Sequence, residues 1–504
     1  MDRVMTIKGL VYSADERFGD EPFIREYINK EFRDTSYRAF RQRCDSVGAW
    51  LQEKFPKGVH AALIGSTDRD YLTAWFGIQC ACSVSVPLDV ANSAERIADE
   101  INRSDSEVLF FDERHEADLE KFRELCPDVK IYVHLHKAFE DTLYLEDIVS
   151  KYESAKPAGM PSPDDLAAIL FTSGTTGQSK GVMLRNSNLM DNATCEPDLG
   201  FHGNKRLTVL PIHHVFCFTC DILCALWYGR TICVNDSLMR ILKNLKIFKP
   251  TDATFVPMIT ASILKRMQQM AERNPDKKAI GKEVFGEDFS VIYSGGAYLS
   301  PEIINGFKEF GIEIAQGYGM TECSPRICTG VKFSTQPGSV GRVVPGCEVK
   351  IVDSEIWVKS PSVMMGYYKN PEETANALTE DGWLRTGDLG YLNDGYLYIT
   401  GRKKNLIILD NGENVSPEEI ENRFVTFEPI KEMVVFEHEH TIAAEIYPDP
   451  EYASDDIRAE IQAQIDAVND TFQPAKRIVK VFYRECEFEK TASKKILRSS
   501  IQNK

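Results

Sequence analysis

The chain has 504 residues, of which 43% are hydrophobic and 27% are charged, a composition that is ordinary for soluble globular proteins. A chain of this length exceeds what one hydrophobic core usually supports, so we expect at least two domains. The formal net charge of −17 argues against a nucleic-acid partner, which would require basic patches. Such acidity fits a soluble cytoplasmic enzyme instead.

The N-terminal stretch, "MDRVMTIKGLVYSADERFGD", mixes charged residues throughout and has no long apolar run. It therefore does not match a secretory signal peptide. No apolar run elsewhere approaches the roughly 20 residues that a membrane span needs. We expect a cytoplasmic protein without a stable membrane span.

Thirteen cysteines lie mostly within apolar segments, and one such segment contains Cys217, Cys220 and Cys224. Cys217 and Cys220 form a CxxC pair, which is compatible with a metal or redox site. No second pair with metal-ligand spacing follows, and the flanking residues are typical of a buried helix. We therefore expect buried free thiols in a reducing cytosol.

Residues 59–89 contain an apolar strand, a Ser/Thr turn, a helix and a second short strand. The same alternation recurs over residues 108–122, 206–214 and 253–267. Strands that alternate with helices in this way predict an α/β fold. The polar, Pro-rich segment over residues 153–165 predicts a loop between two subdomains.

After about residue 330 the pattern changes to short strands separated by turn residues, which predicts a β-rich subdomain. A helix is expected to begin at Pro371, with Asn370 as its N-cap and Glu373 completing a capping box. The segment "YLNDGYLYITGR" predicts a hairpin that turns at residues 393–395.

Beyond Lys404 the remaining residues, about a hundred, are enough for a small separate domain. Within them, the sequence from Ser416 to Glu419 predicts a second capping box at the start of a helix.

The segment "FTSGTTGQSKG", residues 171–181, follows an apolar strand and is small, polar and flexible. It does not match the phosphate loop of P-loop nucleotide triphosphatases, which requires Gly where Ser179 stands and Ser or Thr where Gly181 stands. Its glycines still allow backbone amides to converge on an anion, and Lys180 adds a positive charge. Taken alone, the segment has an alternative interpretation as a flexible surface loop.

Four further segments follow in order: "YGMTE" (318–322), "RTGDLG" (385–390), "GRKKNLIILDNGENVSPEEIE" (401–421) and "KTASKKILR" (490–498). Together with the glycine loop they resemble the motifs of the adenylate-forming (AMP-binding) superfamily, and most of all those of fatty-acyl-CoA synthetases. The resemblance covers essentially the whole chain.

This resemblance implies a large N-terminal domain of α/β subdomains with a β-rich subdomain (residues 1–402) and a small mobile α+β C-terminal domain (residues 403–504). It implies that a small-molecule carboxylic acid reacts with ATP, with Mg²⁺ bound, to give an acyl adenylate and pyrophosphate. The acyl group then passes to the thiol of coenzyme A. An acyl carrier protein, whose phosphopantetheine arm presents the same thiol, is the alternative acceptor.

The resemblance also implies roles for individual residues. Residues that serve the departing phosphates are Thr172, Ser173, Gly174, Thr175, Thr176, Gly177 and Lys180. Residues that form the adenine slot are Gly295, Gly296, Ala297, Tyr318 and Gly319. Thr321 contacts the α-phosphate, and Glu322 helps to hold Mg²⁺. Asp388 binds the ribose hydroxyls, and Arg402 reaches ribose or phosphate.

By the same resemblance, Lys495 is the catalytic lysine that bridges the carboxylate and the α-phosphate. The family has Gly before this lysine, where this chain has Lys494, so the loop is expected to be stiffer. Lys404 matches the hinge about which the C-terminal domain swings between the two half-reactions. A solvated basic tail is the alternative for the segment around Lys495.

The segment "LPIHHVFCF" resembles the one that lines the acyl pocket, with His214 in the matching place as a pocket-wall or catalytic residue. An HHxxxD acyltransferase site is excluded, because Phe218 stands where Asp is required. Phe216 occupies the position at which amino-acid-activating relatives carry Asp, which favours an unsubstituted acyl or aryl acid. Phe216, Cys217 and Tyr293 fit a medium- to long-chain fatty acid. A relative that binds nucleotide without turnover is the remaining alternative.

Overall fold

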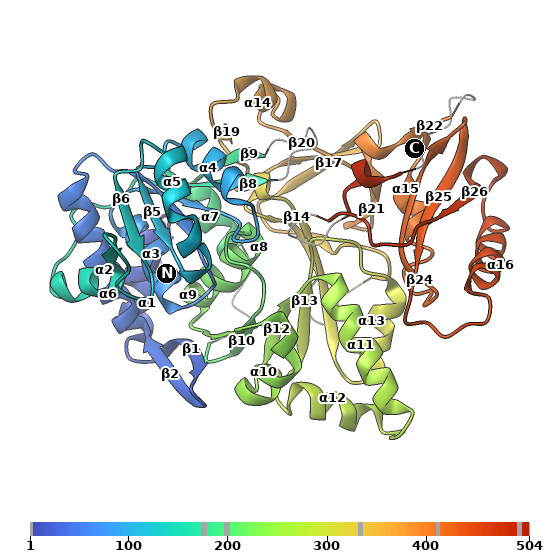
Figure 1. Ribbon diagram of the computed structural model, residues 1–504, viewed down its shortest axis with the longest axis horizontal. Helices are drawn as coiled ribbons and strands as arrows, with labels where there is room; N and C mark the ends of the chain where they lie inside the picture. Colours follow the sequence, from blue (N-terminus) through green and yellow to red (C-terminus); the bar gives the residue numbers. More distant parts are fainter. Residues whose placement is uncertain are drawn as a thin grey trace.

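A computed structural model describes residues 4–172, 179–195, 202–330, 336–409, 414–490 and 496–502. It confirms the α/β fold class, with a large N-terminal part and a small C-terminal domain (Figure 1). Among the described residues, the large part contains two sheets, and the C-terminal domain contains a separate three-stranded sheet and a two-stranded one.

The first sheet has eight strands among the described residues, in the order β19-β9-β8-β4-β3-β5-β6-β7. Its central strands are parallel, as expected for strands joined by helices. Their bounds are β3 His60–Ile64, β4 Val84–Pro87, β5 Val108–Phe111, β6 Ile131–His134, β7 Leu143–Tyr144, β8 Leu166–Thr172, β9 Lys180–Arg185 and β19 Gly366–Tyr367. Helices of this part are α1 Ile7–Phe18, α2 Tyr37–Lys54, α3 Arg69–Cys80, α4 Ala94–Arg103, α5 Leu119–Leu125, α6 Leu145–Lys151 and α7 Asn186–Ala193.

The segment 153–165 is a loop, but the expectation that it separates two subdomains is wrong. It leads from α6 to β8, and β7, just before α6, belongs to the same sheet as β8. The buried ammonium of Lys8 fixes the loop by donating to the carbonyl oxygens of Pro157 at 3.1 Å and Gly159 at 2.7 Å. The amino-terminal helix thus holds the loop in place.

The second sheet has thirteen strands among the described residues, in the order β17-β18-β20-β21-β16-β15-β14-β13-β12-β10-β11-β1-β2. Their bounds are β1 Pro22–Ile28, β2 Glu31–Ser36, β10 Lys205–Thr208, β11 Thr231–Val234, β12 Asp252–Phe255, β13 Val291–Ser294, β14 Glu313–Gly319, β15 Arg326–Thr329, β16 Arg342–Val343, β17 Glu348–Val352, β18 Glu355–Lys359, β20 Leu384–Asn393 and β21 Tyr396–Arg402. The predicted β-rich subdomain is therefore joined to the parallel strands, because β15 pairs antiparallel with β14.

Helices cover one face of the parallel strands β10, β12, β13 and β14 with a shared apolar core (Figure 1). These helices are α10 Ile241–Phe248, α11 Pro257–Ala271, α12 Lys277–Phe285 and α13 Pro301–Glu309. On another side lies the Cys-containing helical segment, in which α8 (Val215–Cys217) continues through a π-helical turn, Phe218–Leu223, into α9 (Cys224–Tyr228). This confirms that the segment is a buried helix.

The two capping boxes predicted from sequence differ from the structure in part. Asn370 caps α14 (Pro371–Ala377) by accepting from the amide of Glu373 at 3.1 Å, but the Glu373 carboxylate pairs with Lys180 instead of returning to the cap. Ser416 precedes α15 (Pro417–Glu421) without a capping hydrogen bond, and its hydroxyl donates to Glu418 at 3.0 Å. The expected hairpin forms, with β20 and β21 meeting at Asn393 and Tyr396.

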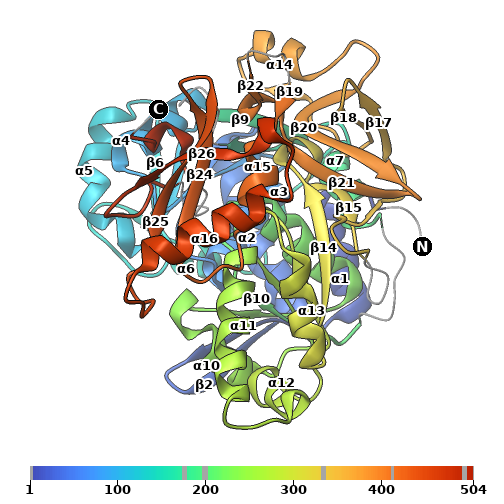
Figure 2. The same cartoon turned by 90° about the vertical axis from the view of Figure 1, so that its right-hand side faces the viewer.

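The C-terminal domain has its own core, formed where one helix packs on a three-stranded sheet. Figure 2, viewed from the side of this domain, shows α16 in front of its strands. Its elements are β22 Ile407–Ile408, β23 Asn414–Val415, β24 Ile430–His438, β25 Thr441–Pro448, α16 Ile457–Asn469 and β26 Ile478–Tyr483, together with α15.

All thirteen cysteines fall within the described residues; each is a free thiol, and nine are buried. This confirms that they are unpaired. Within the described ranges, no helix is both long enough and apolar enough to cross a membrane.

His136 holds together three loops at the carboxyl edge of the eight-stranded sheet. Its Nε2 lies 2.8 Å from Asp68 Oδ2, and its Nδ1 lies 2.6 Å from Glu113 Oε2. Asp68 follows β3 and caps α3, whereas Glu113 follows β5. These carboxylates, Asp68 above all, raise the pKa of His136 to about 10.

The His136 contacts predict a specific pH dependence of stability. Because the folded-state pKa lies above the ordinary value of 6.5, the stabilisation is complete below pH 6.5 and is lost as the pH rises through 10. We expect His136→Gln to lower the urea midpoint of unfolding below pH 6.5 and to leave it nearly unchanged above pH 10.

Asp68→Asn is the matched variant, because Asn caps a helix as well as Asp does but carries no charge. We expect it to remove the larger part of the same pH-dependent difference, because Glu113 still faces Nδ1 of His136. An equal decrease of the urea midpoint in His136→Gln at every pH would contradict this account.

Candidate active site

A cavity of about 510 Å³ lies at the carboxyl ends of β12, β13 and β14, where open α/β sheets bind ligands. The α8–α9 segment forms part of its wall. It brings together residues that the sequence placed in one site, namely His214, Phe216, Tyr293, Gly295, Gly296, Ala297, Tyr318, Gly319 and Thr321.

Gly295 and Gly296 form a turn directly after β13 that a larger residue would obstruct. A Cβ built at Gly295 would lie 3.2 Å from both the carbonyl oxygen of Gly317 and the ring of Phe216. Gly296 has φ +86°, a left-handed conformation that favours glycine. The turn therefore exposes backbone to the cavity, as a slot for a flat base requires.

Gly319, the last residue of β14, has even less room for a side chain. A Cβ built there would lie 1.9 Å from the carbonyl oxygen of Pro325, which is part of the backbone and cannot move aside freely. The close approach brings the segment after β14, which includes Thr321, back against the strand.

The carboxylate of Asp388 is the charged centre of the site and is only 3% exposed. The hydroxyl of Tyr318 donates to its Oδ2 at 2.7 Å, and the Nε of Arg402 lies 2.7 Å from its Oδ1. Burial and the neighbouring carboxylate raise the pKa of Tyr318. Burial opposes the charge of Arg402, but Asp388 outweighs it and raises the pKa of Arg402.

Glu322 lies nearby in a 3-10 turn (Thr321–Cys323) and is almost buried. The hydroxyl of Tyr367 donates to its Oε1 at 2.8 Å, while burial and this carboxylate raise the pKa of Tyr367. Mg²⁺ is commonly held by one or two carboxylates together with substrate phosphates. Glu322 fits that donor set, although the described residues contain no cluster of three or more metal-ligating side chains.

Lys180 opens β9 and forms an ion pair with Glu373 of α14. Its ammonium also lies 5.1 Å from the centre of the Tyr367 ring. The hydroxyl of Thr172, at the end of β8, donates to the Lys180 carbonyl oxygen at 3.5 Å. Five other expected phosphate contacts lie outside the described residues: Ser173, Gly174, Thr175, Thr176 and Gly177.

The expected catalytic Lys495 and its neighbour Lys494 also lie outside the described residues. Lys404, the expected hinge, is described in a 3-10 turn directly after β21. Burial, followed by the charges of Arg402 and Arg498, lowers the pKa of Lys404. Lys404 is thus close enough to Arg402 and to Arg498 for both charges to act on it.

Phe216 and His214, which the sequence assigned to an acyl pocket, both lie in the wall of the cavity. The neighbouring His213 has only 10% of its side chain exposed, and its ring lies 4.2 Å from that of His214; desolvation and this neighbour lower the pKa of His213 well below its usual value. Cys217 does not line the cavity; it is fully buried in the core, against the expectation from sequence.

Sequence reasoning missed the residues that support or extend the site. Tyr367 and Glu373 lie far from the motifs along the chain, and the pairing of β19 with β9 brings them beside Lys180. Three arginines of the cavity wall, Arg206, Arg230 and Arg326, were also missed. Polar residues alternate with apolar ones in the strands "KRLT" (205–208) and "DATF" (252–255), and this alternation could have indicated a polar cavity wall.

Comparison with known families agrees with this geometry. A model of the AMP-binding enzyme family matches residues 12–368, and a model of the AMP-binding enzyme C-terminal domain matches residues 404–504. The chain belongs to the AMP-binding enzyme family.

Among curated relatives, a 4-coumarate–CoA ligase from Humulus lupulus is 31% identical over 72% of this chain and 69% of its own length. A long-chain-fatty-acid–CoA ligase from Cavia porcellus is 29% identical over 81% of this chain and 68% of its own. The anthranilate CoA ligase AuaEII, solved with anthranoyl-AMP, superposes with a TM-score of 0.85 at 19% identity, covering 98% of this chain and 96% of that one. This structural similarity shows that the two chains share the same fold.

The close approach of the Pro325 carbonyl oxygen to Gly319 predicts that any larger residue at position 319 destabilises the protein. We expect Gly319→Ala to lower the free energy of unfolding by about 1–3 kcal/mol, because the added methyl group meets fixed backbone. Gly317→Ala is the matched control on the same strand, since a Cβ there makes only an ordinary 3.4 Å contact. Urea denaturation measures both, and equal losses would contradict the prediction.

Proposed function

We propose that the protein is an ATP-dependent acid–thiol ligase that converts a carboxylic acid into an acyl adenylate and then into an acyl-CoA. The acid has an apolar body, with a medium- to long-chain fatty acid as the leading class, and the enzyme works in the cytoplasm. One observation carries the proposal: a single cavity is lined by the glycine turn at Gly295 and by Tyr318, and also by apolar side chains around Phe216. Nucleotide and acid can therefore meet within it.

The acid and the triphosphate are both anionic, so their reaction requires fixed positive charge and hydrogen-bond donors. Glu322, oriented by the Tyr367 hydroxyl, would hold Mg²⁺, and Thr321 would contact the α-phosphate. Bound Mg²⁺ neutralises phosphate charge as it develops. Asp388 retains acceptor capacity beyond its two present partners, which suits it to the ribose hydroxyls.

Lys180 supplies the positive charge of the proposed phosphate loop, and Glu373 pairs with its ammonium group in this structure. In the proposed reaction the triphosphate replaces Glu373 as the partner of Lys180. Hydroxyl and amide groups of the loop complete the cradle: Thr172, Ser173, Gly174, Thr175, Thr176 and Gly177. The adenine slot uses Gly295, Gly296, Ala297, Tyr318 and Gly319.

Lys495 would bridge the acid carboxylate and the α-phosphate during adenylation. Residues 403–504 would then rotate about Lys404 relative to residues 1–402, so that the thiol of coenzyme A reaches the adenylate. His214 remains in the wall of the acyl side during both steps. Arg402, on the strand before the hinge, would contact ribose or phosphate.

Variants at the two adjacent lysines test this assignment. We expect Lys495→Ala to slow acid-dependent pyrophosphate release by about 100-fold or more, because a charge that stabilises the transition state is lost. It should still convert preformed acyl adenylate and coenzyme A into acyl-CoA. Lys494→Gly is the matched control and should keep both half-reactions.

Loss of adenylation in Lys494→Gly but not in Lys495→Ala would place the catalytic role on the neighbouring position. Equal loss of both half-reactions in Lys495→Ala would contradict the two-step account. Pyrophosphate release without any acyl-CoA would move the acceptor to a carrier protein.

A further inference from the structure

The cavity is apolar at its mouth and charged at its inner end. At the mouth, Leu238 and Met258 line the cavity, and each is more than half exposed. At the inner end, Arg206 on β10 and Thr254 on β12 line it, and Arg206 is only 4% exposed. A chain that enters at the mouth therefore runs past apolar side chains toward a buried charged layer.

The register of the strands gives the depth of this inner end. Thr254 lies opposite Tyr293, which is two residues before Gly295. Arg206 lies opposite Asp252, a further two residues down β12. At about 3.3 Å per residue, these two layers lie roughly 7 Å and 13 Å from the glycine turn along the strands.

Four side chains are joined across these two layers, and we call them the Arg206 network: Arg206, Asp221, Asp252 and Thr254. The guanidinium of Arg206 pairs with Asp252 and lies 3.2 Å from Asp221. It also donates to the carbonyl oxygen of Cys220 at 2.7 Å. The hydroxyl of Thr254 donates to Asp221 at 2.5 Å. The network thus links β10 and β12 to the helical segment that covers them.

The charges at this inner end are balanced. A second guanidinium, that of Arg230, lines the cavity and lies 3.6 Å from Asp252, so two arginines face two carboxylates. Burial opposes the charge of Arg206, but Asp252 and Asp221 outweigh it and raise the pKa of Arg206. Its guanidinium also lies 4.7 Å from the centre of the Tyr293 ring. The network therefore stays charged and is held by several contacts.

A hydrocarbon chain meets different conditions before and at the network. Val209, Leu210 and Phe216 line the cavity before it. Each methylene buried among apolar side chains strengthens binding about fourfold, which is about 0.8 kcal/mol. A methylene that reaches the network must separate its ion pairs or stop short of them, and a buried charge without its partner is costly.

We propose that the Arg206 network sets the upper limit on the length of the acyl chain. The distance of roughly 13 Å from the glycine turn to the layer of Arg206 and Asp252 accommodates about ten methylenes of an extended chain. The substrate class is therefore a medium-chain fatty acid, and hexadecanoic acid is too long for this space. This inference rests on the proposed function, since it concerns the acid that ATP activates.

The test compares straight-chain saturated acids from butanoic to hexadecanoic acid on the intact protein. One readout is kcat/KM for acid-dependent pyrophosphate release, and the other is the rise in Tm caused by each acid, which reports binding. We expect kcat/KM to rise about fourfold with each added methylene and to reach its maximum before hexadecanoic acid. It should fall about tenfold or more with the first acid that reaches the network. The rise in Tm should have its maximum at the same chain length.

The double variant Arg206→Met/Asp221→Ala tests the network itself. It removes one charge of each sign, so that Asp252 and Arg230 remain paired with each other. Because the replacements are apolar and smaller, we expect the maximum to move to an acid longer by about two methylenes or more.

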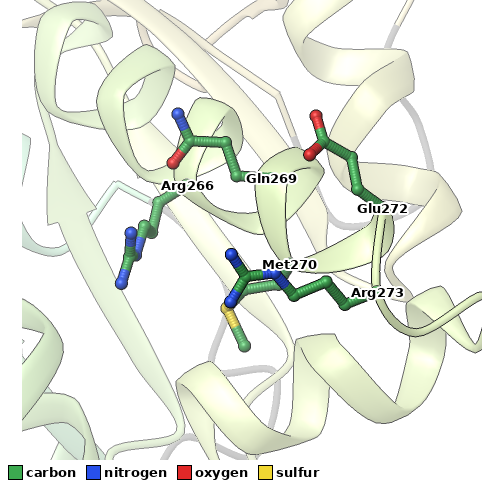
Figure 3. Close-up of a pocket in the computed structure, with 5 residues that line it drawn as sticks. All are labelled: Arg266, Gln269, Met270, Glu272 and Arg273. Atoms are coloured by element: carbon green, nitrogen blue, oxygen red, sulfur yellow. The ribbon is translucent and has the colours of Figure 1, made fainter.

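Arg266→Met is the matched control, because it makes the same arginine substitution outside the cavity. Arg266 is exposed on α11, beside a surface hollow of about 340 Å³ that lies apart from the Arg206 network (Figure 3). It should leave the maximum unchanged. The maximum in the unaltered protein is measurable even where the double variant fails to fold.

The outcomes separate this inference from the proposed function. A kcat/KM that does not decline up to hexadecanoic acid would overturn the inference and leave the ligase intact. A maximum that stays in place in the folded double variant would also overturn it. A maximum in the rise of Tm that moves as expected, without pyrophosphate release for any acid, would support the network and count against the ligase. Neither a rise in Tm nor pyrophosphate release with any acid would count against both.

Discussion

The buried carboxylate of Asp388 is the constraint on which the site depends. A charge that is 3% exposed is costly to bury unless it is paired, and here Tyr318 and Arg402 supply the partners. These three residues come from β14, β20 and β21, so the pairing fixes the β-rich strands against the parallel ones. It also sets the position of Lys404, two residues beyond Arg402. The ion pair between buried Asp388 and Arg402 thus connects the cavity-lining strand β14, through Tyr318, to the start of the C-terminal domain.

The same sheet gives the two ends of the cavity different chemistry. At the carboxyl ends of the strands, glycine turns expose backbone, which suits a nucleotide. Further down, alternate residues on the same face are polar, and the helical segment α8–α9 closes over them. Because side chains alternate across a strand, the opposite face of β10, β12 and β13 stays apolar and packs on α10–α13. A single set of strands therefore carries both a core and a charged pocket.

Much of this was predictable from sequence, because the relevant signals are local. Alternating strands and helices, the helix start at Asn370 and the ordered motifs predicted the fold class and the family, and both are confirmed. Contacts between distant segments were not predictable. Glu373 pairs with Lys180, and Tyr367 pairs with Glu322. The loop over residues 153–165 connects two parts of the same sheet. All three follow from the order of the strands. Ser416 is not a cap: its hydroxyl donates to Glu418 and accepts from no helix amide. The roles of the site residues remain predictions.

The central claim is that this chain forms an acyl adenylate before any thiol takes part. The most direct measurement is exchange of labelled pyrophosphate into ATP, with Mg²⁺ and a carboxylic acid present and no coenzyme A. The account predicts exchange that requires the acid, together with an acyl adenylate detectable by mass spectrometry. Exchange that does not depend on any acid, or ATP binding with no exchange for any acid, would contradict it.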